Sequence, residues 1–141
     1  MIEMLNSLRP VPEPDPDSAP FWEGVNQGKL LVQRCSSCAR HRFPPGEVCP
    51  HCLSREADWA EVSGRGRVCS WIVVRHPIPR EMFADEIPYV VALIDLDEGV
   101  RIASNLVEIS PEIVRDGMAV EVLFRRSGNN RQLHAFRPVA D

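Results

Sequence analysis

The sequence is short of lysine, of tyrosine and of long apolar runs, and these shortages exclude several classes of protein. Of its 16 basic residues one is lysine (Lys29), and the net charge of -4 disfavours a globally basic nucleic-acid binder. No stretch approaches the roughly 18 apolar residues that a membrane span needs. The first residues have neither the basic start nor the apolar core of a signal peptide. We therefore expect a cytoplasmic protein with no membrane association.

The cysteine count is also informative. Five cysteines in 141 residues is an odd number, which argues against a fully paired disulfide framework and fits a reducing compartment. The 44% hydrophobic and 26% charged residues are typical of a globular chain of one domain, or of two small ones.

Negative charge is concentrated at the N-terminal end. Residues 1–24 have a net charge of -4, and the remainder of the chain is neutral. Five prolines lie between Pro10 and Pro20 and alternate with acids, so this arm is predicted to be extended rather than packed, either along a second chain or disordered. The acids concerned are Glu3, Glu13, Asp15, Asp17 and Glu23.

A short helix is predicted after the arm, with Pro20 in its first turn and Gly28 beyond its end. It carries Phe21 and Trp22, and two adjacent large aromatics cannot both face one small core. One of them is a candidate partner-docking residue. The alternative is that Trp22 covers the cysteine-bearing segment of its own chain.

Alternating, β-rich segments follow residue 60 and predict five strands in a small closed barrel, of which the OB-fold is the commonest kind. The strand from Pro88 to Leu96 is nearly all apolar and is predicted to be buried on both faces. The fold class is therefore mainly β, with a helix and cysteine-bearing module in residues 1–60 and the barrel in 61–141. The expected strands are Arg67–His76, Pro88–Leu96, Val100–Val107, Ala119–Arg126 and Gln132–Val139.

The strongest motif is a pair of Cys-x-x-Cys sequences separated by ten residues. Four thiolates without an open coordination position describe a structural zinc site. Rubredoxin-type iron and four buried free cysteines are the alternatives, and Cys69 is interpreted as a small buried hydrophobe. The ligands are Cys35, Cys38, Cys49 and Cys52, with His41 and His51 as spare candidates.

The order of these features resembles a known family. Phe21-Trp22, the two cysteine pairs, Phe43-Pro44-Pro45, the Pro88–Asp95 strand and Gly117–Val120 follow one another as in proteins that join a rubredoxin-like zinc ribbon to an OB-fold. The resemblance covers residues 18–139. Glycine often follows each cysteine pair in such ribbons, whereas here Ala39 and Leu53 stand there.

The resemblance implies a non-catalytic accessory subunit of an acyl-CoA-processing complex, with structural zinc. Its partner would be a thiolase-like or aldolase-like enzyme subunit, in a hetero-oligomer, with a CoA thioester at the interface of the complex. The partner and the acyl substrate do not follow from the resemblance.

The remaining candidates for chemistry are weaker. His76 and His134 have no nucleophile partner at a recognisable sequence spacing, so catalytic residues are not expected. Two arginine-rich stretches are candidates for binding the phosphates of CoA, with a solvated barrel rim as the alternative. The residues concerned in the second stretch are Arg125, Arg126 and Arg131.

Single-stranded nucleic-acid binding is the alternative function, because OB-folds use aromatic residues on a strand face for base stacking. Trp71, Phe124 and Phe136 are few and are interspersed with aliphatic residues, so we expect them in the core and do not expect a nucleic-acid partner.

Overall fold

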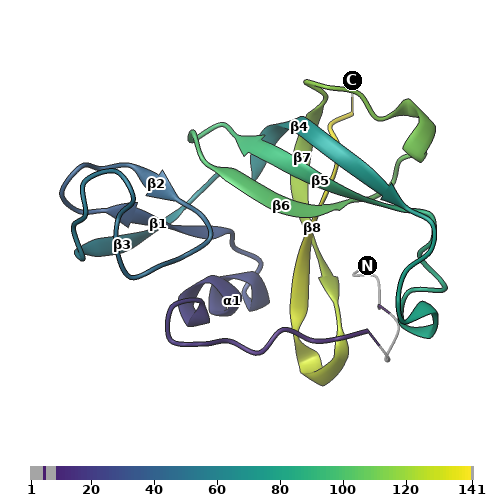
Figure 1. The fold of residues 1–141 in the computed structure, drawn as a ribbon, viewed down its shortest axis with the longest axis horizontal. Coiled ribbons are helices and arrows are strands. Elements are labelled where there is room, and N and C mark those ends of the chain that lie inside the picture. The colour runs from purple at the N-terminus through teal and green to yellow at the C-terminus, as the bar shows by residue number, and fades with distance from the viewer. Residues whose placement is uncertain (1–4, 6–8, 141) are drawn as a thin grey trace.

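The protein consists of a small three-stranded sheet and a closed five-stranded barrel, with a short helix beside both (Figure 1). We describe it from a computed structural model, which places residue 5 and residues 9–140. Glu3, one of the acids of the arm, lies outside the described residues. The mainly β fold with an N-terminal helix and an OB-type barrel is confirmed.

The helix α1 spans Ala19–Asn26, within the predicted limits, and Gly28 follows it with a left-handed φ of 73°. Phe21 and Val25 point into the core, with exposed fractions of 2% and 0%. The helix is tied to the barrel at its far end, where the side chain of Asn26 accepts a hydrogen bond of 2.9 Å from the backbone of Gln132.

The cysteine-bearing module is built on the sheet order β2-β1-β3. Its strands are β1 (Leu31–Cys35), β2 (His41–Arg42) and β3 (Ala57–Glu61), all antiparallel. Because β1 ends at Cys35, the sheet places the first cysteine at the start of the metal-binding turn.

The barrel has the strand order β4-β5-β6-β8-β7 and closes between β4 and β7. All pairings are antiparallel except the seam between β6 and β8, which is parallel and pairs Asn105 with Ala135 and Leu106 with Phe136. All five expected strands are present, with ends shifted by no more than a few residues. The bounds are β4 Arg65–Val74, β5 Tyr89–Leu96, β6 Arg101–Leu106, β7 Ala119–Arg126 and β8 Gln132–Pro138. Three short 3-10 turns, η1 Arg80–Met82, η2 Pro111–Ile113 and η3 Gly128–Asn130, lie in the connections.

The prediction for β5 was wrong in one respect. Its residues alternate, with Val90, Ala92 and Ile94 inside the barrel and the intervening side chains outside. A closed barrel has one interior, so a strand of it buries one face. Leu93 is therefore 38% exposed on the outer face, and Ile72 of the neighbouring strand is 62% exposed.

Barrel closure depends on two glycines. Gly64 has a φ of 76°, and a Cβ there would lie 2.2 Å from Cγ1 of Val122. At Gly66 a Cβ would lie 2.5 Å from the carbonyl oxygen of Asp95. Strands β4, β5 and β7 therefore come together at a distance that no side chain at these positions permits.

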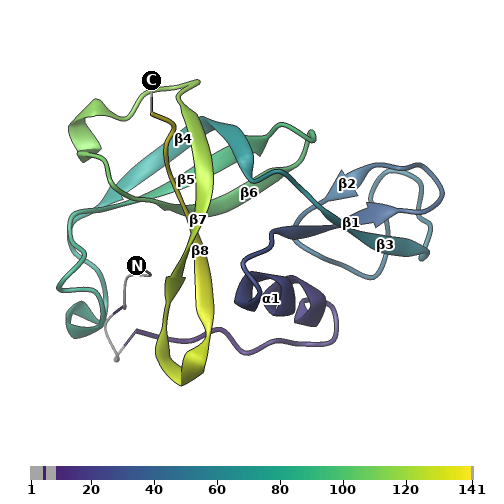
Figure 2. The ribbon, with the colours of Figure 1, turned by 180° about the vertical axis from the view of Figure 1, so that it is seen from behind.

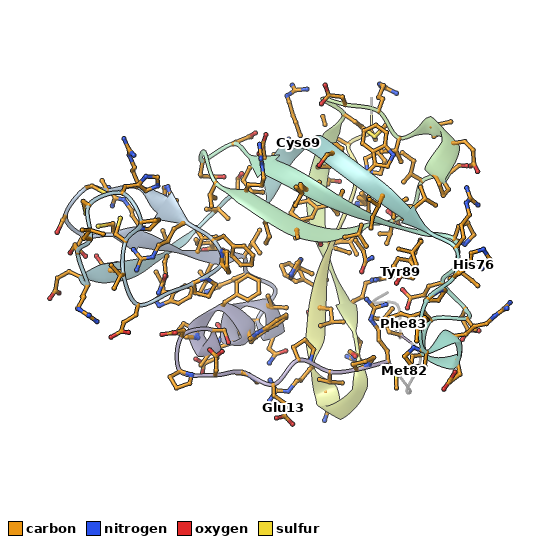
Figure 3. The ribbon with its side chains drawn as sticks, in the orientation of Figure 1. Glu13, Cys69, His76, Met82, Phe83 and Tyr89 are labelled. Atoms are coloured by element: carbon orange, nitrogen blue, oxygen red, sulfur yellow. The ribbon has the colours of Figure 1, made fainter. Side chains whose placement is uncertain are left out.

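The proline-rich arm differs from its prediction. It is extended, but it packs along its own barrel and crosses the β7–β8 hairpin near its turn to reach α1 (Figure 2). Arg9 forms an ion pair with Glu86 and donates a hydrogen bond of 3.0 Å to Asn105. The acids face outward, as Glu13 shows at the lower edge of the molecule (Figure 3). Alternating prolines and acids predict an extended chain, but they do not show which surface it lies on.

One hydrophobic core joins the modules. Phe21 and Val25 of the helix, Val32 of the ribbon and Ile94 and Phe136 of the barrel belong to a single buried cluster. Within residue 5 and residues 9–140, no helix is long and apolar enough to cross a membrane.

Candidate metal centre and neighbouring sites

Four cysteine sulfurs converge at one end of the ribbon. The Sγ atoms of Cys35, Cys38, Cys49 and Cys52 all lie within 4.8 Å of one another. The Cys35–Cys52 and Cys38–Cys49 Sγ distances are 3.6 and 3.7 Å. Tetrahedral zinc with Zn–S bonds of about 2.3 Å places its sulfurs about 3.8 Å apart. The four ligands predicted from the sequence therefore have the geometry of a zinc site.

The turns that carry the two cysteine pairs are equivalent. Ala39 donates a backbone hydrogen bond to Cys35, and Leu53 donates one to Cys49, each of 2.9 Å. Ala39 and Leu53 have φ values of 64° and 66°, the left-handed region that usually selects glycine. The absence of glycine after each pair therefore does not change the turn. It leaves local strain, of about 1–2 kcal/mol per residue, that metal binding must outweigh.

The cysteines differ in how readily they ionise. A hydrogen bond from the backbone N–H of Cys38, together with that of Ser37, lowers the pKa of Cys35 to about 6 in spite of burial. Burial opposes ionisation of Cys49, but backbone N–H groups of His51 and Cys52 lower its pKa below the usual value. At Cys52 the backbone of Ser54 favours the thiolate, yet the neighbouring cysteines and burial raise its pKa to about 11. Four thiolates at these distances repel one another, so all four can be ionised together only with a cation bound between them.

The chemistry of the donor set is that of a closed site. Among the described residues, no further His, Asp or Glu joins this cluster. His51 is exposed, and its Nδ1 lies 2.9 Å from a guanidinium nitrogen of Arg40. A zinc ion held by four thiolates keeps no position for water or substrate, so its role is to hold the ribbon together.

The three arginines predicted to bind phosphate are not equivalent. Arg125 is 4% exposed and forms an ion pair of 3.3 Å with Glu86, so its place is inside the protein rather than on the rim. A sequence pattern identifies a basic strand end, but not which of two adjacent arginines faces inward. Arg126 is exposed and Arg131 is partly exposed, on either side of the β7–β8 turn.

The two adjacent aromatics of α1 also differ. Phe21 is buried at 2% exposure and contacts Phe43, with ring centroids 5.2 Å apart. Trp22 is partly exposed and stacks on His134, at a centroid distance of 6.2 Å and an interplanar angle of 27°. Of the two candidate docking residues, Trp22 is the one that reaches the surface.

The predicted stacking aromatics lie in or against the core. Phe136 is completely buried, and Trp71 and Phe124 pack against the core cluster. They therefore do not form the exposed platform that single-stranded nucleic acid requires.

The sequence did not identify a pairing between Ser104 and His134. Their Oγ and Nδ1 atoms are 2.8 Å apart, although the residues are separated by 30 positions on β6 and β8. Burial, followed by the positive charge of Arg125, lowers the pKa of His134 to about 4. An imidazole with such a low pKa is a weak base. His134 therefore has a serine partner that sequence spacing does not reveal, but the two do not form a nucleophile–base pair.

The fold and the four-thiolate cluster together define a zinc-ribbon protein with an OB-fold barrel. Models described as the ChsH2 rubredoxin-like zinc ribbon domain and the ChsH2 C-terminal OB-fold domain match residues 22–58 and 59–125. A DUF35 domain-containing scaffold protein of Methanocaldococcus jannaschii is 40% identical over 107 residues, which cover 74% of each chain. The chain belongs to this DUF35 family, and the resemblance found in its sequence is confirmed.

Two further proteins are similar over most of the chain. A probable enoyl-CoA hydratase alpha subunit of Thermomonospora curvata is 43% identical over 132 residues. These cover 94% of the present chain and 40% of that protein, so the chain spans less than half of its length. The solved structure of an Ltp2-ChsH2(DUF35) aldolase matches with a TM-score of 0.84 and 42% identity, covering 92% of this chain and all of that one.

Proposed function

We propose that this protein is a non-catalytic accessory subunit of an acyl-CoA-processing complex. The proposal rests mainly on one observation. This chain is similar to the full length of a chain in a solved Ltp2-ChsH2(DUF35) aldolase. The names of two relatives, a hydratase alpha subunit and a scaffold protein, support the same role. The partner would be a thiolase-like or aldolase-like enzyme subunit, and the assembly a hetero-oligomer.

The chemistry of the chain agrees with an accessory role. The four-thiolate site holds its ion without an open position, so metal-assisted hydrolysis is not its function. Burial lowers the pKa of His134, which makes the imidazole of the Ser104–His134 pair a weak base and supports this role. The reaction would then take place on the partner subunit.

The outer face of β4 and β5 is the surface we assign to the partner. Ile72 lies opposite Val91, and Leu93 lies one residue pair further along the same face. Ile72 is 62% exposed and Leu93 38% exposed, an arrangement that is costly in water and favourable in an interface. Trp22 lies on α1 and is a second candidate contact.

Arg126 and Arg131 are the residues we assign to the phosphates of a CoA thioester held at the interface of the complex. Both are accessible, and a guanidinium binds phosphate through two hydrogen bonds. Arg125 instead forms an ion pair that holds the side chain of Glu86 in place. Replacing Arg126 and Arg131 with alanine should weaken the CoA affinity of the complex by about tenfold. Unchanged affinity would instead identify these arginines as part of a solvated barrel rim that does not bind CoA.

Co-expression with thiolase-like and aldolase-like proteins tests the proposal. The chain should co-purify with one of them in a fixed ratio, and Ile72→Asp should weaken the association. Ile113→Asp is the matched control, because Ile113 is 61% exposed but lies at η2. A chain that stays monomeric with every partner, or binds equally well as the Ile72 variant, would contradict the assignment.

A further inference from the structure

The ribbon contains a buried arginine whose charge no carboxylate neutralises. Arg42 lies on β2 and is 7% exposed. Its Nε donates to Oε1 of Gln33 at 2.8 Å, and its Nη2 donates to the carbonyl oxygen of Gly46 at 3.0 Å. Over the part of the chain that the structure describes, no carboxylate pairs with Arg42, and its buried Nη1 has no hydrogen-bond partner. A buried cation needs a nearby negative charge to offset the cost of leaving water.

The guanidinium of Arg42 contacts both chain segments that lead to the cysteine pairs. Strands β1 and β2 lie side by side (Figure 1) and pair Gln33 with Arg42. Gln33 stands two residues before Cys35, and Gly46 stands three residues before Cys49. The side chain of Gln33 also accepts a hydrogen bond of 2.8 Å from the backbone N–H of Gly46. This three-way contact therefore ties the strand that ends at the first pair to the loop that leads to the second.

Hydrogen bonding alone does not account for a charged side chain at this position. Both acceptors are neutral, and burying a guanidinium costs far more than burying the amide of a neutral side chain. Glu47 is the residue after Gly46, but its side chain is 74% exposed and pairs with Arg55 on the surface. Glu47 therefore does not neutralise Arg42.

The four-thiolate metal site supplies a buried charge of the opposite sign. Zinc bound by four thiolates has a net charge of about -2. Cys35 and Cys49 are each 1% exposed, so much of this charge is shielded from water, where attraction to a cation is stronger. Arg42 contacts the segments that precede both of these ligands, so the cation and the metal site belong to the same small module.

We propose that Arg42 is a positioning residue of the metal centre, with two effects. Its positive charge offsets the net negative charge of the zinc–thiolate site, and its fork, together with Gln33, holds the loop that brings the second cysteine pair to the first. Groups of this kind outside the ligand set change metal affinity by about 10- to 100-fold. Metal binding then makes the buried guanidinium favourable, and the guanidinium in turn strengthens metal binding.

The zinc affinity of the full chain, measured by competition with a chelator of known affinity, is the first test. Arg42→Met removes the charge and the fork but keeps an unbranched side chain, and it should weaken zinc binding by about 10- to 100-fold. Arg42→Lys keeps the charge and should weaken binding by less than about tenfold. Arg55→Met is the matched control, because it removes an exposed arginine from the same module, and it should change the affinity by less than about threefold.

Cobalt substitution separates the charge of Arg42 from its effect on the loop. Thiolate-bound Co²⁺ has a sulfur-to-metal charge-transfer band, and a cation outside the sulfurs attracts an electron on sulfur more than one on the metal. Arg42→Met should therefore move this band to longer wavelength, whereas Arg42→Lys should leave it in place. Gln33→Met breaks hydrogen bonds of the same network without changing the charge, so it should weaken metal binding but not move the band.

Thermal melts of the metal-loaded variants check that each one folds. Should Arg42→Met fail to fold, Arg42→Gln replaces it in both measurements, because it is also neutral and keeps an amide donor. A zinc affinity of the neutral variant within about threefold of the parent would overturn the inference. An unmoved cobalt band in that variant, or an equal loss of affinity in Arg42→Lys, would also overturn it.

Discussion

Glu86 holds two arginines, and its replacement should be among the most damaging in the barrel. It pairs with Arg9 through one carboxylate oxygen and with Arg125 through the other. The side chains of Arg9, Glu86 and Arg125 are 13%, 15% and 4% exposed, so the cluster is largely shielded from water. Removing one partner of a buried ion pair costs about 3–5 kcal/mol, and we reduce this to about 2–4 kcal/mol because Glu86 retains some solvent.

Glu86→Gln keeps the size of the side chain and removes the charge, so it isolates the electrostatic effect. Arg125→Met should cost less, about 1–2 kcal/mol, because Glu86 then still pairs with Arg9. The double variant should be less destabilised than the sum of the two single variants, because the charge left unpaired by one change is removed by the other.

Urea unfolding followed by tryptophan fluorescence measures all three variants. The zinc concentration is held constant, because metal binding shifts apparent stability. A loss below about 1 kcal/mol for Glu86→Gln, or a double variant whose loss equals the sum, would refute the reasoning. The same experiment measures how much the buried Arg125 contributes to stability.

Three further predictions follow from the described contacts. The pKa of His134 falls from 6.5 to about 4 on folding, so the unfolded chain takes up the proton first as the pH is lowered. Between pH 6.5 and pH 4 the free energy of unfolding, measured with urea, should therefore fall by about 3 kcal/mol more in the parent than in His134→Phe. Equal pH profiles of the two proteins would contradict this prediction. Cys49→Ser should lower the zinc content, measured by elemental analysis, from one ion per chain and melt the ribbon, whereas full zinc content in the variant would remove Cys49 from the ligand set. Gly66→Ala should lower the free energy of unfolding by about 3 kcal/mol, because the added Cβ would meet the backbone of Asp95. Gly46→Ala, whose Cβ would have nothing within 4 Å, should change it by less than about 1 kcal/mol. Similar losses in both variants would disprove the close approach at Gly66.

The sequence predicted those features that depend on residues close together in the chain. The metal ligands follow from two cysteine pairs, and the strand limits follow from alternating apolar residues bounded by turns. Even the deviation after each pair, at Ala39 and Leu53, left the turn unchanged because hydrogen bonds to Cys35 and Cys49 hold it.

Features that depend on strand pairing were not predictable in this way. The Ser104–His134 contact exists because β6 and β8 meet in parallel at the seam, an arrangement that neither strand encodes alone. The inward side chain of Arg125 depends on Glu86, which is 39 residues away. Pattern analysis gives each strand its two faces, but the closure of the barrel decides which face is the interior.

The arm described above has a consequence for how the protein is made. Arg9 is synthesised before its partners Glu86 and Asn105, which follow 77 and 96 residues later. At roughly 5–20 residues per second, the arm therefore waits about 5–20 s for the surface on which it rests. The ribbon can acquire its metal during this interval, so Arg9 reaches its final contacts after the ribbon that follows it in the chain.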